Sequence, residues 1–340
     1  MKAIYVKDIK PGHTISNVAF VVIKAEKKVA KNGKEYMDIT IGDSTGTILC
    51  KVWSEKYEAC SADALKEGVV VLASGTASEF MSKTQMVLSI LIPTTDYAEE
   101  DFVPVSKRNI EDMYKELMEH VEGISDRHLQ KLIKNIFADQ ELATKFKKTP
   151  AAMKHHHAFV GGLMEHILEM LHFAKPMWDV YQPCNVDLIK AGIILHDIGK
   201  VEEIVWRNMA IEYSDRGKLL GHIQIGLQII DRYKQDDFDV ECFQLLQHVI
   251  LSHHGKLEYG SSVVPATIEA KIVSLADDAS AKLRGYMNLY NDSQNNGTSF
   301  SEYNRAMETA VYLKEYQSQA DYVMEKKEEL NDKLKQLELI

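Results

Sequence analysis

The stretch AGIILHDIGK (191–200) places a histidine and an aspartate, His196 and Asp197, at the end of an apolar run, with Lys200 one turn later. Burying an unpaired carboxylate costs more free energy than one helix supplies, so Asp197 must be paired, neutralised or bound to a metal ion. Apolar residues at three-and-four spacing continue on both sides of this stretch, and they predict an almost entirely helical chain over 109–313.

Four other elements of this helical half carry histidine or aspartate within or beside apolar runs. They are KHHHAFVGGLMEHILEM (154–170), GKLLGHIQIG (217–226), HVILSHHG (248–255) and SLADDASAK (274–282), which supply His166, His222, His253 with His254, and Asp277. A lone histidine on an apolar face is more often a core residue than a ligand. Five such elements, with a His–Asp pair in one of them, favour a site for divalent metal ions. No cysteine joins them, which argues against a structural thiolate zinc site.

Imidazoles and carboxylates together suit Mn²⁺, Fe²⁺, Zn²⁺ or Co²⁺, and the residues alone do not choose among these ions. A carboxylate such as Asp197 can bridge two ions. Two ions about 3.5–4 Å apart would clamp a phosphodiester and activate the attacking water between them. His155 and His156 read as solvated or capping residues with no place in this set.

The first 95 residues have the alternating pattern of strands. Three predicted strands, AFVVIKAEKKV (19–29), EYMDITIGD (35–43) and TILCKVW (47–53), precede a short helix ending at Gly68, and VVVLASGTASEF (69–80) and TQMVLSILIP (84–93) follow it. Three strands, a helix and two strands are the order of an OB barrel, a small closed five-stranded sheet. Another small β-barrel without a ligand is the alternative.

OB barrels that hold single-stranded nucleic acid use exposed aromatic side chains beside basic groups. The candidates in this barrel are two lysines beside the first turn and four aromatic residues: Lys31, Lys34, Phe20, Tyr36, Trp53 and Phe80. Core packing is the competing interpretation of each aromatic residue, and Phe20 in particular could simply belong to the core.

The formal net charge of −10 divides unevenly along the chain. Residues 1–95 carry +2 and the remaining 245 residues carry −12, so a polyanion is expected to contact the N-terminal part. The four cysteines have no paired spacing, which indicates reduced thiols and a cytoplasmic location. No run of 18 apolar residues and no secretory signal are visible, so a membrane is not expected as a partner.

The pattern H…HD…D resembles that of the HD phosphohydrolase superfamily, and the HDIGK form is typical of it. The matching residues in this chain are His166, His196, Asp197 and Asp277. The two-metal branch of the superfamily carries further histidines, and the residues that resemble these are His222, His253 and His254.

A closer resemblance joins HHAFVGGLMEH (156–166), LSHHGKLEYGSSVVPATIEA (251–270) and the barrel in front of them. Together these resemble the YhaM-type 3′→5′ exoribonucleases of Gram-positive bacteria over nearly the whole chain. The resemblance implies an all-β OB-fold domain followed by an all-α HD-type domain. It implies an enzyme that removes nucleotides from the 3′ end of single-stranded RNA, prefers Mn²⁺, and leaves single-stranded DNA open as a second substrate.

Carried over residue by residue, the resemblance implies a site for two ions. The first ion would be held by His166, His196, Asp197 and Asp277. The second would share Asp197 and add His222 and His253, with His254 as an alternative or extra ligand.

The resemblance also implies roles for two residues beside the ions. Lys200 would face the scissile phosphate and offset the charge that develops there, so that Asp197, Lys200 and His157 form the catalytic set. His157 would touch the phosphate or a ligand. The competing interpretation of Lys200 is a surface ion pair with Glu202 or Glu203.

The chain departs from these relatives at one place. Many of them carry LHYADNLDAK where this chain has VSLADDASAK (273–282), so Ser274 and Ser280 replace a histidine and an aspartate. Asp277 aligns best with the metal ligand, and Asp278 competes with it.

The expected domains are an OB-fold domain (1–95), a linker with leading helices (96–150), an HD-type domain (151–313) and a C-terminal helix (314–340). Two rival functions stay open beside the exoribonuclease. One is a phosphohydrolase of a free nucleotide or cyclic dinucleotide, and the other is a non-catalytic RNA-binding protein with a structural metal site. A homo-oligomer is a further expectation.

Overall fold

The structure is a computed structural model that describes residues 2–30, 33–80, 83–98, 101–153, 156–207, 210–293 and 297–314. Lys31 and most of the expected C-terminal helix therefore lie outside the described residues. Within the described ranges, none of the helices has the length and apolar character that crossing a bilayer requires.

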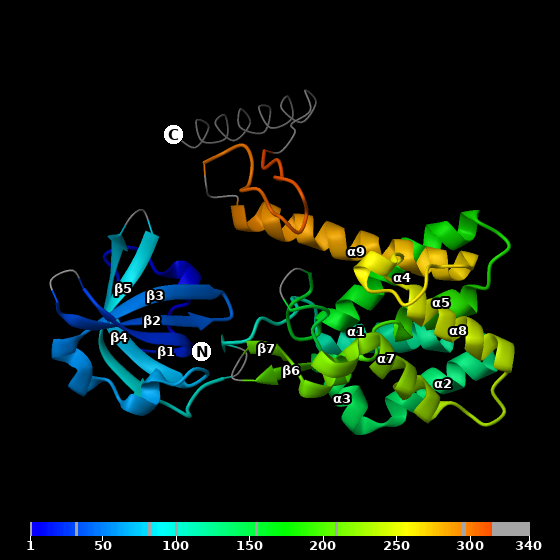
Figure 1. Cartoon of the computed structure of the whole chain (residues 1–340), viewed down its shortest axis with the longest axis horizontal. Coiled ribbons are helices and arrows are strands. Elements are labelled where there is room, and N and C mark those ends of the chain that lie inside the picture. Colours follow the sequence, from blue (N-terminus) through cyan, green and yellow to red (C-terminus); the bar gives the residue numbers. More distant parts are fainter. Residues whose placement is uncertain are drawn as a thin grey trace, which may run out of the picture. The chain divides into compact units, whose positions relative to one another are not determined.

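The N-terminal part folds as a closed barrel of five strands, which confirms the predicted fold class (Figure 1). The strands are β1 (Thr14–Val29), β2 (Glu35–Asp43), β3 (Gly46–Trp53), β4 (Val70–Phe80) and β5 (Lys83–Pro93). They close in the order β1-β2-β3-β5-β4, and the β3–β5 pair is parallel while the other pairs are antiparallel. The single helix expected before β4 is instead two short 3₁₀ helices, Ser54–Ala59 and Ala62–Leu65.

The rest of the first compact unit, which ends at Ala281, is mostly helical. Its helices are α1 (Ile110–Glu122), α2 (Arg127–Ala138), α3 (Gln140–Lys148), α4 (Gly162–Val180), α5 (Val186–Leu195), α6 (Lys200–Glu203), α7 (Asp215–Tyr233), α8 (Val240–Ser252) and the first half of α9 (Ile268–Ser293). Helix α1 stops at Gly123, and Asp126 caps α2, because its carboxylate accepts from two backbone N–H groups.

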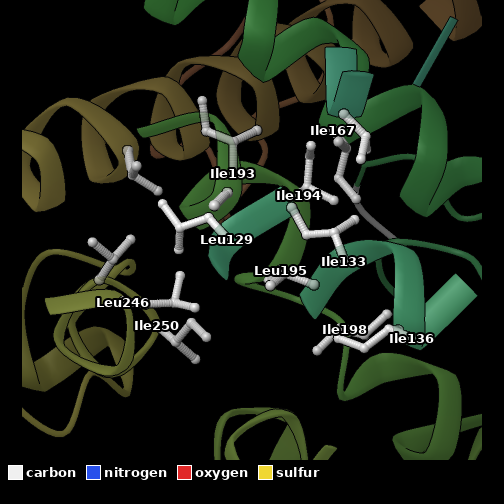
Figure 2. Packing of buried hydrophobic residues seen from close by; sticks show 14 of the residues in the cluster. Leu129, Ile133, Ile136, Ile167, Ile193, Ile194, Leu195, Ile198, Leu246 and Ile250 are labelled. Atoms are coloured by element: carbon white, nitrogen blue, oxygen red, sulfur yellow. The ribbon is translucent and has the colours of Figure 1, made fainter. Parts of the chain in front are cut away.

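Helix α5 lies at the centre of the helical core. Figure 2 shows its Ile193, Ile194 and Leu195 among side chains of α2 and α8. Every residue from Ala191 to Lys200 is buried. A helical segment buried on all sides must be apolar on all sides, which explains why Ala191–Leu195 has no polar face. The buried helix therefore delivers His196 and Asp197 into the interior.

Two segments differ from the predicted run of helices. Strands β6 (Ile204–Arg207) and β7 (Ala210–Tyr213) pair in antiparallel fashion. In the second compact unit, which starts at Lys282, α9 ends at Ser293, and residues 297–314 pair only through isolated bridges such as Phe300–Tyr312. The prediction of helices up to residue 313 is therefore wrong, and the proposed domain boundaries stay predictions.

Candidate metal centre

The histidines and aspartates reach one place because several helices end or bend there. His196 and His253 directly follow the last residues of α5 and α8, and His222 follows a kink of α7 at Gly221, whose φ is 71°. The turn after Asp197 passes very close to α7. A Cβ added at Gly199 would lie 1.9 Å from the His222 carbonyl oxygen, so the glycine of HDIGK permits this approach.

Two groups of ligand atoms meet at Asp197. In the first, one ligand atom from each of His166, His196 and Asp197 lies within 4.8 Å of the others, and in the second the same holds for His222, His253 and His254. The Oδ2 atom of Asp197 lies 3.1 Å from His196 Nε2. Its Oδ1 atom lies 3.4 Å from His222 Nε2 and 3.7 Å from His253 Nε2. One carboxylate thus faces both groups, as a bridging ligand would.

Asp277 on α9 links the same two groups from the other side. Its Oδ1 atom lies 3.2 Å from His166 Nε2, and its Oδ2 atom lies 3.6 Å from His254 Nδ1. Its neighbour Asp278 is exposed. Asp277 is therefore the aspartate of this helix that geometry places at the cluster.

Backbone carbonyls fix the proton on two of the imidazoles. Nδ1 of His196 lies 2.8 Å from the Ile193 carbonyl oxygen, and Nδ1 of His253 lies 2.7 Å from that of Ile250. A carbonyl oxygen only accepts, so each Nδ1 must carry hydrogen. The Nε2 atoms, which point at the cluster, are then the ones available to a metal ion.

Side chains fix the other two imidazoles in the same way. Nδ1 of His222 lies 3.1 Å from Oε1 of Glu203, which also accepts from the His222 backbone N–H. Nδ1 of His166 lies 2.9 Å from Oγ of Ser280, whose hydroxyl donates to Glu169 Oε2 at 2.8 Å. All four imidazoles therefore present Nε2 to the carboxylates.

The electrostatics favour ionised carboxylates in this buried place. Burial alone would raise the pKa of Asp197, but Lys200 and His196 hold this pKa well below its usual range. Burial would likewise raise the pKa of Asp277, and the neighbouring imidazoles of His166 and His254 keep it low. Burial lowers the pKa of His253, which keeps that imidazole neutral. Burial acts to lower the pKa of His196 as well, but Asp197 raises it, so metal binding there competes with protonation.

Several buried atoms at the centre are left without hydrogen bonds. They are the Nε2 atoms of His166, His196 and His253 and the Oδ1 atom of Asp197. Buried polar atoms are nearly always satisfied, and divalent ions would satisfy these. The residues therefore fit a metal centre, and the two clusters are able to hold divalent ions.

Lys200 lies behind Asp197 and not at the surface. Its Nζ lies 2.6 Å from Asp197 Oδ2 and donates to the Ala151 carbonyl oxygen at 2.6 Å, and the residue is 8 % exposed. The alternative of a surface pair with Glu202 or Glu203 is wrong, because the ammonium faces inward. Its predicted contact with the scissile phosphate stays a prediction.

The histidine-rich loop before α4 lies closer to the centre than the sequence indicated. His157 is fully buried, and its Nε2 lies 3.1 Å from Glu169 Oε2. Ligand atoms of His156, His157 and His166 lie within 4.8 Å of one another. The interpretation of His156 as a solvated residue is wrong, because its Nδ1 atom is buried and its ring centroid lies 5.6 Å from that of His166. Burial lowers the pKa of His156 to about 3. His155 lies outside the described residues. The sequence feature that could have indicated this position is the run of three histidines followed by apolar residues.

On the barrel, three of the predicted aromatic residues and one lysine form a connected group. The rings of Tyr36 and Trp53 have centroids 5.4 Å apart. Nζ of Lys51 lies 5.2 Å from the Tyr36 ring centroid and 5.3 Å from that of Phe80, which is 52 % exposed. Sequence reasoning missed Lys51, although it lies two residues before Trp53 and therefore on the same face of β3.

The other barrel candidates do not join this group. Phe20 is fully buried in the barrel core, so its prediction as a base-stacking residue is wrong. The ammonium of Lys2 lies 4.0 Å from its ring centroid. Lys34 is exposed and pairs with Glu55 at 2.9 Å.

Comparison with known proteins places these features in context. The model of the HD domain family matches residues 163–282, and a helicase family model, TraI_2, matches residues 104–184. Two relatives named 3′-5′ exoribonuclease YhaM are 35 % identical over 271 residues (Shouchella clausii) and 33 % identical over 271 residues (Halalkalibacterium halodurans). Each match covers 78 % of this chain, and it covers 83 % of the first relative and 82 % of the second.

A solved structure also matches. The second OB-fold domain of replication protein A from Methanococcus maripaludis matches 28 % of this chain and 97 % of that chain, with 16 % identity and a TM-score of 0.23.

A five-stranded barrel followed by an HD domain with this cluster defines an enzyme of the nuclease class. Within that class, the chain belongs to the family of YhaM 3′-5′ exoribonucleases.

Proposed function

We propose that this enzyme hydrolyses single-stranded RNA from its 3′ end and depends on divalent metal ions. The observation that carries the proposal is the convergence of four imidazole Nε2 atoms on the carboxylates of Asp197 and Asp277. The name of the relatives, 3′-5′ exoribonuclease, supports the substrate and the direction.

The geometry supports two ions that share Asp197. One would be held by His166, His196, Asp197 and Asp277, and the other by Asp197, His222 and His253, with His254 close enough to join. Imidazole and carboxylate ligands together suit Mn²⁺. Bound at this place, the ions would make a water nucleophilic near neutral pH and neutralise charge on the phosphate.

The chain's own side chains would hold this arrangement in place. Lys200 keeps Asp197 ionised and oriented from behind. Glu203 holds the His222 ring with its proton on Nδ1. Oriented ligands raise metal affinity, because the ordering of each side chain is complete before the ion arrives.

The barrel would hold nucleotides upstream of the reacting end. Tyr36, Trp53 and Phe80 offer ring faces on which bases stack, and Lys51 lies among them to offset a phosphate charge. Stacking on aromatic rings tolerates every base, so little sequence preference is expected, and single-stranded DNA would bind the same surface.

The direct test is incubation of the purified chain with 5′-labelled single-stranded RNA and Mn²⁺. The expected result is a ladder of products that shortens from the 3′ end and disappears when EDTA is added. Intact RNA together with hydrolysis of a free nucleotide or a cyclic dinucleotide would contradict the proposal and support the rival phosphohydrolase.

A further inference from the structure

A series of ion pairs and hydrogen bonds connects Asp197 to His166 behind the metal centre. Lys200 joins Asp197 to the Ala151 carbonyl oxygen, and the Ala151 N–H donates to the His157 carbonyl oxygen at 3.1 Å. The His157 ring in turn contacts the carboxylate of Glu169.

The remaining steps meet at a single oxygen atom. Oε2 of Glu169 lies 3.1 Å from His157 Nε2 and accepts from the Ser280 hydroxyl at 2.8 Å. Oγ of Ser280 then lies 2.9 Å from His166 Nδ1, which completes the connection to the first group of ligands.

We propose that Glu169 is a positioning residue of the metal centre, which sets the proton of the His166 imidazole through Ser280 and holds His157 against the ligands. This inference rests on the proposed metal dependence of the site. The carboxylate of Glu169 contacts His157 and Ser280, so its action on the ligands passes through these two neighbours.

The proton of Ser280 decides which nitrogen of His166 is available. A hydroxyl has one hydrogen to donate, and Ser280 gives it to Glu169. Its oxygen is then left to accept from His166 Nδ1, so that His166 Nε2 keeps its lone pair. Without Glu169, the Ser280 hydroxyl would have His166 Nδ1 as an alternative acceptor. The imidazole would then carry its proton on Nε2, where it blocks a metal ion.

Helix geometry explains why Glu169 can act here. It follows His166 by three residues on α4, and residues three apart lie on the same face of a helix. Its side chain is 25 % exposed, so it can stay ionised without the full cost of burying a charge. Ser280 on α9 is fully buried, so its hydroxyl has no solvent to bond instead.

The second contact of Glu169 holds a strained loop. His157 has a φ of 48°, in the left-handed region, which is strained for a residue other than glycine. The loop passes so close to α4 that a Cβ at Gly162 would lie 1.9 Å from the His157 carbonyl oxygen. The contact with Glu169 ties the His157 ring to the helix that carries His166.

The test compares Mn²⁺ affinity, measured by calorimetry or by Mn²⁺ spin resonance, in full-length Glu169→Ala and Ser280→Ala. Loss of a partner behind a metal ligand typically weakens metal binding about 10–100-fold, and this weakening is expected for both variants. Asp179→Ala is the matched control, because it removes an exposed carboxylate from the same helix and should leave the affinity unchanged.

Nitrogen-15 NMR of labelled histidine supplies the readout that a general loss of stability would not move. In the metal-free parent, His166 should carry its proton on Nδ1, and in Glu169→Ala the proton should move to Nε2. In the double variant, Mn²⁺ affinity should fall by much less than the product of the single effects, because Glu169 reaches His166 through Ser280.

Unchanged affinity and an unchanged His166 tautomer in a folded Glu169→Ala variant would overturn the inference. Should that variant fail to fold, Glu169→Gln keeps the shape, and the same two readouts then decide. A chain that binds Mn²⁺ as expected but leaves RNA intact would contradict the proposed function alone, so the two failures are distinguishable.

Discussion

The ammonium of Lys200 lies 2.6 Å from the Asp197 carboxylate, and the two side chains are only 10 % and 2 % exposed. An aspartate at this depth needs a partner whenever no metal ion neutralises it. Lys200 is that partner in the structure, which accounts for a lysine one turn after Asp197 in the stretch HDIGK.

Replacing Lys200 by methionine should therefore destabilise the metal-free chain. Removal of one partner from a buried ion pair leaves the other charge uncompensated and typically costs about 3–5 kcal/mol. Urea unfolding in EDTA measures this loss, and saturating Mn²⁺ should recover part of it by neutralising Asp197. Lys175→Met removes the lysine of an exposed pair with Asp179 and should cost less than about 1 kcal/mol. Equal losses in the two variants would contradict the account.

Asp277 and its neighbour Asp278 form a matched pair for testing the ligand set. Asp277→Asn should lower kcat/KM on single-stranded RNA by roughly 100-fold or more, which corresponds to about 2.7 kcal/mol of lost transition-state stabilisation. Asp278→Asn should stay within about twofold of the parent, since Asp278 is exposed and Asp277 faces His166. Steady-state assays at fixed Mn²⁺ decide, and a larger effect at Asp278 would reverse the assignment.

The aromatic group on the barrel predicts a loss of RNA binding that is separate from catalysis. Trp53→Ala should weaken the binding of single-stranded RNA by about 1–3 kcal/mol, the usual contribution of one stacked base. Fluorescence anisotropy in EDTA measures this binding without cleavage. Tyr97→Ala, an exposed aromatic residue outside the group, should bind as the parent does.

Lys51 adds an electrostatic prediction on the same surface. Lys51→Ala should reduce the slope of log K against log salt concentration by about 0.7, as expected for one lost phosphate contact on a single strand. An unchanged salt slope in Lys51→Ala, or equal losses of RNA affinity in Trp53→Ala and Tyr97→Ala, would show that this surface does not bind the RNA.

The pKa of His156 predicts how stability depends on pH. Burial, with smaller contributions from His166 and Lys200, lowers this pKa to about 3, whereas an unfolded histidine titrates near ~6.5. Between these values only the unfolded chain binds the proton, so the stability due to neutral His156 is complete above about pH 6.5 and is lost as the pH falls toward 3.

Urea unfolding of the metal-free chain at several pH values tests this prediction. His156→Gln should reduce the slope of stability against pH by up to about 1.4 kcal/mol per pH unit. His172→Gln, which replaces an exposed histidine, is the control. A slope that His156→Gln leaves unchanged would mean that this imidazole is not held neutral.

The sequence predicted the barrel and the metal cluster because both have a local signature. Alternating apolar residues define the strands, and apolar runs that end in histidine or aspartate define the ligands. The pairing of β6 and β7 was missed because strands of four residues cannot be told from a helical segment by periodicity. Periodicity also indicates on which face of a strand a side chain lies, but not whether that side chain is buried. Phe20 could therefore not be assigned to the core from spacing alone.

The contacts behind the ligands could not be predicted from the sequence. The partners of Lys200 and Glu169 come from segments far apart in the chain, and no spacing rule connects Ala151 to Lys200 or Ser280 to Glu169. The position of His156 depends in the same way on how the loop before α4 folds back.

Anomalous diffraction from crystals grown with Mn²⁺ tests the central claim most directly. The account predicts two peaks about 3.5–4 Å apart, with Asp197 between them, His166, His196 and Asp277 around one, and His222 and His253 around the other. An absence of peaks at this cluster, or Mn²⁺ bound elsewhere on the chain, would contradict it.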